Sequence, residues 1–467
     1  MSLLDPLFRW DALDGLFTDR ARVQGMLDFE AALARAEARL GVIPKSAVAP
    51  IASKCRAGLV DMPALASAAA RAGNLAIPMV KQLTELVAMD DSEAARYVHW
   101  GATSQDAIDT GFVLQLRPAL EKFEAELDRF ADSLARLAKK HRATPVAART
   151  WMQQALPTTF GFIVAGWLDA LLRSQERLHE AGKGAIVLQF GGAAGTLAAL
   201  DERGIEVAKA LGNELNLPVP EVSWHSHRDR IAAVATAFGL CIGTLGKIAR
   251  DISLHAQTEI AEIFEPAGEG RGGSSTLPHK RNPVTCAVVL AAGIRVPGLV
   301  STMLSAMVQE EERGLGGWHA EWETMPDLIG IAGGALHHLA DTIPGLEVDK
   351  AKMRDNLEIT HGLIYSEAVQ MALAGAMGRG AAHEHVQAAG KLAVEEHRHL
   401  REVIKSDSEI AKHLSAKEIG RLFNPKEYLG VADELIDRVL QAHASRKPKS
   451  VDKEAADPHG VRRKKRR

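Results

Sequence analysis

The sequence is poor in cysteine, in aromatic residues and in long uncharged apolar runs, and each shortage excludes a class of protein. Its three cysteines, Cys55, Cys241 and Cys286, are widely spaced and show no metal-ligand pairing, which argues against a disulfide scaffold and a cysteine metal site. No apolar stretch approaches the roughly 20 uncharged residues of a membrane span. The N-terminus MSLLDPLFRWDALD lacks the basic-then-apolar pattern of a signal peptide. We therefore expect a protein of the reducing cytoplasm without a membrane partner.

The formal net charge of −3 conceals an asymmetry between the body of the chain and its end. Residues 446–467 hold ten lysines and arginines against three acids, a net of +7, which leaves −10 for residues 1–445. Because this tail lacks apolar residues, we expect it to be disordered, and a nucleic-acid partner is not expected. Because residues 1–445 carry a net negative charge, their overall field repels anions. Any anion-binding pocket must therefore have its own nearby positive or hydrogen-bond-donating groups.

The composition favours helices over sheets, because only 5% of the residues are aromatic and alternation with a period of two is rare. An apolar seam with spacings of four and three residues predicts a long bundled helix from about residue 117 to 140, with Pro118 in its first turn. The seam consists of Leu116, Leu120, Phe123, Leu127, Phe130, Leu134 and Leu137. A second seam runs from Ile231 to Ile252 and predicts another long helix.

A third long helix is expected from residue 284 to 312, kinked at Pro297. Helices of about 25–30 residues span roughly 40–45 Å, so they predict an all-α protein with a central long antiparallel helix bundle. We expect three helical domains and a tail, with bounds at residues 1–107, 108–351, 352–445 and 446–467. The histidine pairs His383/His385 and His225/His227 are spaced by two residues, which places their side chains apart on a helix and argues against metal sites.

The segment 266–283 has no hydrophobic periodicity that would explain it. It reads PAGEGRG and then GSSTLPHKRN, so Gly272 and Gly273 stand directly before two serines, Ser274 and Ser275. Such a segment loses much conformational entropy on ordering and buries little apolar surface. It is either an ordinary solvated loop or a loop that closes over a ligand, and Lys280 and Asn282 supply the polar groups for the second case.

Three further segments carry polar residues that packing does not require. They read HWGATSQDAIDT at 99–110, RTWMQQALP at 149–157 and EEERGLGGWHAEWET at 310–324. Thr103 and Ser104 are typical of a helix start, where free N–H groups also attract carboxylates. Arg313 is able to bind a carboxylate through two parallel hydrogen bonds. The two tryptophans of the third segment are candidates for the wall of a pocket.

The segment at 273–282 resembles the signature G-S-S-x-M-P-x-K-x-N of the fumarase/aspartase superfamily, with Leu277 where methionine is usual. The other three segments resemble superfamily regions in the same order. The resemblance implies three helical domains and a homotetramer whose active sites are shared between subunits. It further implies that Ser274 is the base, that Lys280 and Asn282 stabilise an aci-carboxylate dianion, and that the substrate is bound by His99, Thr103 and Ser104.

Two departures from the adenylosuccinate and argininosuccinate lyases bear on the reaction. Trp151 stands where those enzymes have a proton-transferring histidine, and Ala287 stands where they have the glutamate that orients it. Indole cannot exchange a proton near neutral pH. Either the chain is a non-catalytic homologue, or its reaction needs no second proton transfer. A carboxylate of the substrate itself fits the second case, because with a pKa near roughly 4 it is already anionic, and it is tethered to its target.

The bacterial 3-carboxy-cis,cis-muconate cycloisomerases are similar at these places, since they share R-T-W-x-Q, the signature loop without the later glutamate, and W-H-A-E-W-E-T-x-P. This resemblance implies lactone formation from a small tricarboxylate by internal carboxylate addition and protonation of the α-carbon, with no cofactor and no metal. Gln153 and Arg313 are then further substrate-binding residues, and Trp151 is a pocket wall that excludes water. The alternatives are a fumarate-releasing C–N lyase of the adenylosuccinate lyase type and a non-catalytic scaffold.

Overall fold

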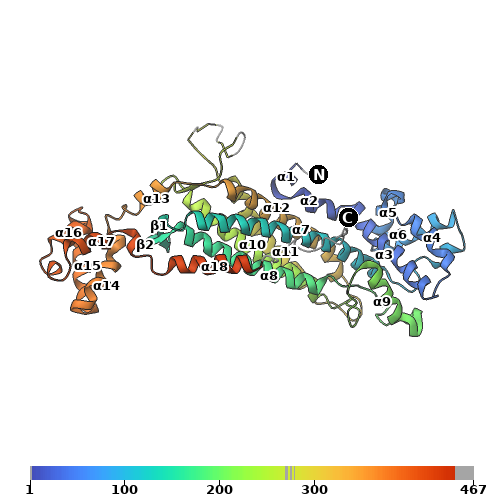
Figure 1. The fold of residues 1–467 in the computed structure, drawn as a ribbon. Helices are drawn as coiled ribbons and strands as arrows, with labels where there is room; N and C mark the ends of the chain where they lie inside the picture. The colour runs from blue at the N-terminus through green and yellow to red at the C-terminus, as the bar shows by residue number, and fades with distance from the viewer. Residues whose placement is uncertain (1–2, 269–271, 274–275, 278, 447–467) are drawn as a thin grey trace, which may run out of the picture.

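Five long helices form the centre of the computed structural model, which describes residues 3–268, 272–273, 276–277 and 279–446. They are α7 (Ser104–Lys140), α8 (Phe160–Ala185), α10 (Asp229–His255), α11 (Val284–Ser305) and α12 (Gly317–Thr342). They lie side by side along one long axis (Figure 1). Both seams expected from the sequence are buried, with Phe123 and Phe238 in edge-to-face contact between α7 and α10. The expected all-α bundle is confirmed.

Shorter helices gather at the two ends of this bundle, while α1 (Asp5–Phe8) and α2 (Asp11–Asp14) lie along its side against α12 (Figure 1). The N-terminal group is α3 (Asp19–Arg39), α4 (Val48–Lys54), α5 (Met62–Ala72) and α6 (Ala76–Ala88), and α9 (Gly204–Leu215) packs on α3. The C-terminal group is α13 (Lys350–Asn356), α14 (Ser366–Met377), α15 (Arg379–Glu395), α16 (Leu400–Ser406) and α17 (Ala416–Leu422). The last helix, α18 (Ala432–Arg446), packs back on α7 and α8.

The apolar interior is divided into two cores. One contains the bundle together with the N-terminal helices, and Ile436 of α18 belongs to it. The other is formed mainly by residues 357–423 of the C-terminal group. Two antiparallel strand pairs complete the fold, β1 (Pro145–Thr150) with β2 (Gln153–Thr159) and β3 (Ile263–Phe264) with β4 (Glu347–Val348). The domain bounds given above stay a prediction. Because α18 packs on the bundle, the C-terminal group ends before α18 begins.

Two helix bounds expected from the sequence are wrong. The first helix begins at Ser104 and not near residue 117, so Pro118 lies inside α7. Its first turns are fixed by buried polar side chains such as Asp106 and Asp109, which an apolar seam does not reveal. The third helix ends at Ser305 and not at residue 312, because the Gln309 side chain folds back and donates to the Ala306 carbonyl at 3.1 Å.

By length and composition alone, α10 and α11 are long and apolar enough to cross a membrane, although at least one charged residue interrupts each and neither has the roughly 20 consecutive uncharged residues of a membrane span. Core helices of soluble proteins meet the same criterion. Here α10 packs against α8, α11 and α12 within the bundle. One side of α11 is left uncovered, with Ile294 80% exposed.

Glu262 joins three elements at the C-terminal end of α7. Its side chain is fully buried and accepts hydrogen bonds from Arg149 at 3.0 and 2.8 Å, from His255 Nδ1 at 2.5 Å and from Asn356 Nδ2 at 2.7 Å. Burial acts to raise the pKa of Glu262, but the bonds from His255, Arg149 and Asn356 outweigh it and the pKa is lowered. The carboxylate therefore holds the β1–β2 hairpin against α10 and α13.

We predict that Glu262→Ala lowers the free energy of unfolding by about 3–5 kcal/mol, because it leaves Arg149 without its counter-charge. Urea unfolding measures the loss. Since the folded-state pKa is depressed, the contribution of Glu262 is present above its unfolded pKa and is lost as pH falls through the folded pKa. The exposed carboxylate of Glu409, paired with Lys412, is the control, and Glu409→Ala should leave the unfolding midpoint unchanged. Equal effects of the two substitutions would contradict this role of Glu262.

Candidate active site

The segment 99–110 contains the start of α7, at the Thr103 and Ser104 that the sequence marks as typical of a helix start. Thr103 is the N-cap residue, and its N–H donates to Asp106 Oδ2 at 3.0 Å, which fixes the first turn. Ser104 is the first residue of the helix. Arg313, from the loop between α11 and α12, donates to Thr103 Oγ1 and to the Ala193 carbonyl, both at 3.0 Å. The guanidinium of Arg313 thus contacts the hydroxyl group of the N-cap residue of α7.

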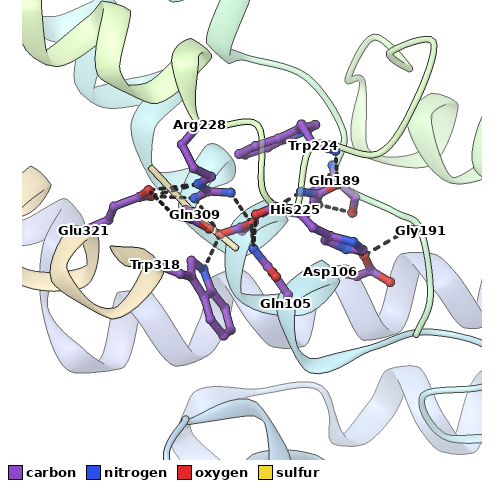
Figure 2. A network of polar contacts seen from close by, with 12 residues as sticks. Gln105, Asp106, Gln189, Gly191, Trp224, His225, Arg228, Gln309, Trp318 and Glu321 are labelled. Atoms are coloured by element: carbon purple, nitrogen blue, oxygen red, sulfur yellow. Dashed lines mark hydrogen bonds and ion pairs between the residues drawn. The ribbon is translucent and has the colours of Figure 1, made fainter. Parts of the chain in front are cut away.

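Asp106 holds two further loops against the start of α7 (Figure 2). Its buried carboxylate accepts from the N–H groups of Gly191 at 3.0 Å and Gly192 at 2.9 Å, and from His225 Nε2 at 2.7 Å. His225 is 3% exposed. The His225 ring is therefore a structural donor to a buried charge just before the start of α10.

His99 lies just before this helix start, in a left-handed conformation with φ of +58°. Its Nδ1 is 2.6 Å from Oε1 of Glu30, a residue of α3 that is 1% exposed. Burial acts to lower the pKa of His99, but the charges of Glu30 and Asp106 and the hydrogen bond to Glu30 outweigh it, so the pKa is raised. Together with Arg313, His99 makes this end of α7 a site with local positive charge.

The motif at 318–324 has a structural role that the sequence did not indicate (Figure 2). Arg228 is 3% exposed and binds Asp109 of α7 at 2.6 Å and Glu321 of α12 at 2.5 Å. Trp318 is buried and donates Nε1–H to Asp109 Oδ1 at 3.0 Å. Trp318 therefore fixes the start of α12 to α7, while Trp322, the second tryptophan of the segment, lines a small cavity of about 30 Å³ together with Arg228 and Glu321.

At the other end of α7, the two ends of the 266–283 segment lie together. The Asn282 N–H donates to the Gly272 carbonyl at 2.8 Å, and Gly273 pairs with Arg281 in an antiparallel bridge. Lys280 and Asn282 line a cavity of about 240 Å³ together with Gly272 and Gly273. Ser274 and Ser275 lie outside the described residues.

Glu347 and Glu265 fix the base of this segment. Glu347 accepts from Arg281 at 2.7 Å and from the Ala267 N–H at 3.2 Å, so it binds both ends of the segment. The Glu265 carboxylate accepts from the N–H groups of Thr285 at 3.1 Å and Cys286 at 2.9 Å, at the start of α11. Cys286 is buried and serves as a small core residue.

The segment 149–157 forms the β1–β2 hairpin beside this end of the bundle. Thr150 pairs with Gln153, so Trp151 and Met152 are the two turn residues, with φ of +51° and +66°. Positive φ at both positions is the pattern of a type I′ turn, which is strained for residues other than glycine, asparagine and aspartate. Trp151 is 95% exposed. Within one chain the indole therefore stands at the tip of a hairpin, where it is among the residues that line a groove of about 1150 Å³.

The predicted site residues thus fall into two groups at opposite ends of α7. The first, which we name the capping group, is His99, Thr103, Ser104 and Arg313, and the second, the loop group, is Trp151, Gln153, Lys280 and Asn282. Between Ser104 and the hairpin of Trp151 lie the 37 residues of α7, which are roughly 55 Å long, and between Asn282 and Arg313 lie the 22 residues of α11, which are roughly 33 Å long. No single copy of the chain brings its described site residues into one pocket.

Among the described residues, one cluster has metal-ligand geometry. Ligand atoms of Glu126, His337 and Asp341 lie within 4.8 Å of one another. Arg129, however, binds Glu126 at 2.5 Å and Asp341 at 2.7 Å. Arg129 and His337 each contact both carboxylates, so the cluster is an ion-pair network between α7 and α12.

We predict that Asp109→Asn is more destabilising than Glu321→Gln. Asp109 accepts from Arg228 and Trp318, so its loss should cost about 3–5 kcal/mol. Burial raises the pKa of Glu321 against the opposing effect of Arg228, so its charge contributes less. Urea unfolding of the two variants compares the losses, and a larger loss for Glu321→Gln would contradict the assignment of Asp109 as the centre of the network.

Comparisons with known proteins show the family to which the chain belongs. A family model described as Lyase matches residues 8–298, and one described as adenylosuccinate lyase C-terminus matches residues 362–439. The chain is 53% identical to a 3-carboxy-cis,cis-muconate cycloisomerase of Bradyrhizobium diazoefficiens, over 94% of this chain and 98% of the relative. It is 55% identical to the enzyme of that name from Pseudomonas aeruginosa, over 94% and 96%.

A solved structure shows the same fold. The crystal structure of the 3-carboxy-cis,cis-muconate lactonizing enzyme from Pseudomonas putida matches with a TM-score of 0.91 and 50% identity, covering 95% of this chain and 99% of that one. The chain therefore belongs to the fumarase/aspartase superfamily of lyases, within the group formed by the 3-carboxy-cis,cis-muconate cycloisomerases.

Proposed function

We propose that this chain is a 3-carboxy-cis,cis-muconate cycloisomerase, which forms 4-carboxymuconolactone in the protocatechuate branch of the β-ketoadipate pathway. The near-full-length match to enzymes of that activity carries the proposal. The exposed indole of Trp151, in place of a proton-transferring imidazole, agrees with it. The reaction is an isomerisation, so no atom is gained from or lost to solvent overall.

In the lactone-forming direction, one carboxylate of the substrate forms a C–O bond to the adjacent double bond. The electron pair of that double bond moves to the α-carbon and into its carboxylate, which becomes an aci-carboxylate dianion. Protonation of the α-carbon completes the product, and the reverse reaction is a β-elimination. Because the attacking carboxylate is already ionised, no general base is needed to activate it.

The loop group handles the α-carbon and its carboxylate in this proposal. Ser274 delivers or removes the carbon-bound proton. Lys280 supplies a positive charge, and the Asn282 amide donates a hydrogen bond to the dianion; charges and donors fixed in place before the reaction stabilise such a state strongly. In support, Lys280 and Asn282 line one cavity, and the bond from the Asn282 N–H to Gly272 holds the ends of the loop together.

The capping group holds the remaining carboxylates of the tricarboxylate. His99 and Arg313 supply positive charge, and Thr103 and Ser104 supply hydroxyl groups at the N-terminus of α7, where N–H groups favour anions. In support, Arg313 is bonded to Thr103, and His99 has a raised pKa. These local charges offset the acidic body of the chain.

Both groups meet on one substrate only if different copies of the chain contribute them, and we propose a homotetramer with shared sites. The uncovered apolar surface supports this assembly. Trp151 and Ile294 are 95% and 80% exposed, and a groove of about 1150 Å³ along α8 and α10 is lined by Trp167 and Leu240. In the assembly, Trp151 would be the wall that keeps water from the reacting carbon. We place the enzyme in the cytoplasm, in agreement with its three free, buried cysteines.

The two alternatives are less well supported. A fumarate-releasing C–N lyase needs a proton donor for its leaving amine, and the residue at that position is Trp151. A non-catalytic scaffold has no use for Lys280 and Asn282 beside one cavity.

We predict that the purified protein removes the absorbance of 3-carboxy-cis,cis-muconate, and that Lys280→Ala lowers kcat by roughly 10²–10³-fold because the dianion loses its cation. Ser274→Ala should also lower kcat strongly. Lys412→Ala, at an exposed ion pair, is the matched control and should retain full activity. The assignment fails if the native protein leaves this substrate unchanged but releases fumarate from a succinyl-amine.

Mixing experiments test the shared site. Lys280→Ala and Arg313→Ala should each be nearly inactive alone. After joint dissociation and reassembly, the mixture should regain about a quarter of the wild-type activity, because one site in four draws both groups from intact copies. Reassembly of either variant alone is the control. A mixture that regains nothing would mean that each site is built within one copy.

A further inference from the structure

Glu30 is a buried acid outside the groups described above. It lies in α3, which packs along α7, and it is 1% exposed. Its Oε1 is 2.6 Å from His99 Nδ1, and its Oε2 has no hydrogen-bond partner within the described part of the chain. A buried carboxylate with a single partner depends on that partner for neutralisation.

A second buried glutamate on the same helix differs from Glu30 in having no basic partner. Glu37 lies two turns further along α3, fully buried, and neither of its oxygens has a hydrogen-bond partner within the described residues. Burial, together with the negative charge of Glu30, raises the pKa of Glu37 to about 9, so Glu37 is protonated and neutral near pH 7. Of the two glutamates, Glu30 is the one whose carboxylate is paired with an imidazole, that of His99.

The backbone at His99 is held in a conformation that non-glycine residues rarely adopt. Its φ is +58°, and Gly101 follows with a φ of +69° and packs so closely on Leu200 that a Cβ there would lie 2.8 Å from a leucine methyl. Such a conformation persists only where the surroundings fix it. With Nδ1 directed at Glu30, Nε2 is the nitrogen left to donate to an outside group.

The charged groups around His99 come from three elements. Glu30 approaches from α3 and Asp106 from the first turn of α7, while Arg313 lies beside Thr103, four residues along the chain. The charge of Asp106 is shared with His225 and three backbone N–H groups. Within the part of the chain that the structure describes, Glu30 has no donor other than His99, so it is the acid that most directly favours a charged imidazole.

We propose that Glu30 is a positioning residue which keeps His99 protonated and directed through Nε2 at one carboxylate of the substrate. The inference rests on the proposed function, in which His99 belongs to the capping group. Glu30 itself does not touch the substrate. It acts by fixing both the charge and the orientation of the imidazole, so that the ring donates to an anion and cannot act as a neutral acceptor.

Titration of His99 by NMR in the unliganded protein tests the pairing without turnover. In Glu30→Gln the shape is kept but the charge is removed, so the pKa of His99 should fall. Glu37→Gln is the matched control, because it changes an equally buried glutamate that is already neutral. It should leave the pKa of His99 where it is in the wild type.

Kinetics test the consequence for binding. Near neutral pH, Glu30→Gln should raise KM for 3-carboxy-cis,cis-muconate by roughly tenfold or more while kcat changes little, because a charged hydrogen bond to the substrate is lost. KM should rise with pH as His99 loses its proton, and in Glu30→Gln this rise should occur at lower pH than in the wild type. The double variant Glu30→Gln/His99→Gln should be no worse than His99→Gln alone. Glu30→Asp keeps the negative charge, so its KM should rise less than that of Glu30→Gln. It is the substitute test variant if Glu30→Gln folds poorly.

An unchanged pKa of His99 in Glu30→Gln overturns the inference, and so does an equal rise of KM in Glu30→Gln and Glu37→Gln. A wild-type protein that does not turn over this substrate refutes the proposed function instead, and the NMR titration then still decides whether Glu30 sets the charge of His99.

Discussion

The start of α7 depends on the neutralisation of buried acids. Within two turns, Asp106 and Asp109 are both buried, and each is surrounded by donors from other elements. Asp106 receives two backbone N–H groups of the 191–192 loop and His225, while Asp109 receives Arg228 and Trp318. Because an uncompensated buried charge costs several kcal/mol, these donors cannot be removed singly without a large loss. The same bonds fix the helix start on which Thr103 and Ser104 sit.

A second constraint follows from the length of the bundle. The helices that give the molecule its core also place its two groups of polar residues far apart, which is why we propose that different copies of the chain complete each site. The proposed assembly also accounts for the surfaces left exposed. The strained hairpin tip at Trp151 and the uncovered side of α11 are suited to contact with other copies of the chain. In that proposal the same helices serve stability within the chain and catalysis between chains.

Parts of this arrangement could be predicted from the sequence, because their signals are local. The seams of α7 and α10, the helix start at Thr103 and the polar loop at 266–283 each have a pattern within a short stretch. The part of α7 before Leu116 has no apolar seam, because buried polar side chains such as Asp106 and Asp109 occupy its inner face. The seam alone therefore predicts a helix start that is too late. His225 and Glu30 carry no motif at all. Their roles depend on partners 119 and 69 residues away in the chain, which only the folded structure brings near.

The central claim is that the nucleophile belongs to the substrate and arrives already ionised, which is why an indole can occupy the position of an imidazole. Turnover in ¹⁸O-labelled water, followed by mass spectrometry of the lactone, tests this claim most directly. The account predicts a lactone whose ring oxygen carries no label, because that oxygen comes from a carboxylate of the same molecule. Label in the ring, or an open-chain hydrated product, would mean that water is the nucleophile and would contradict it.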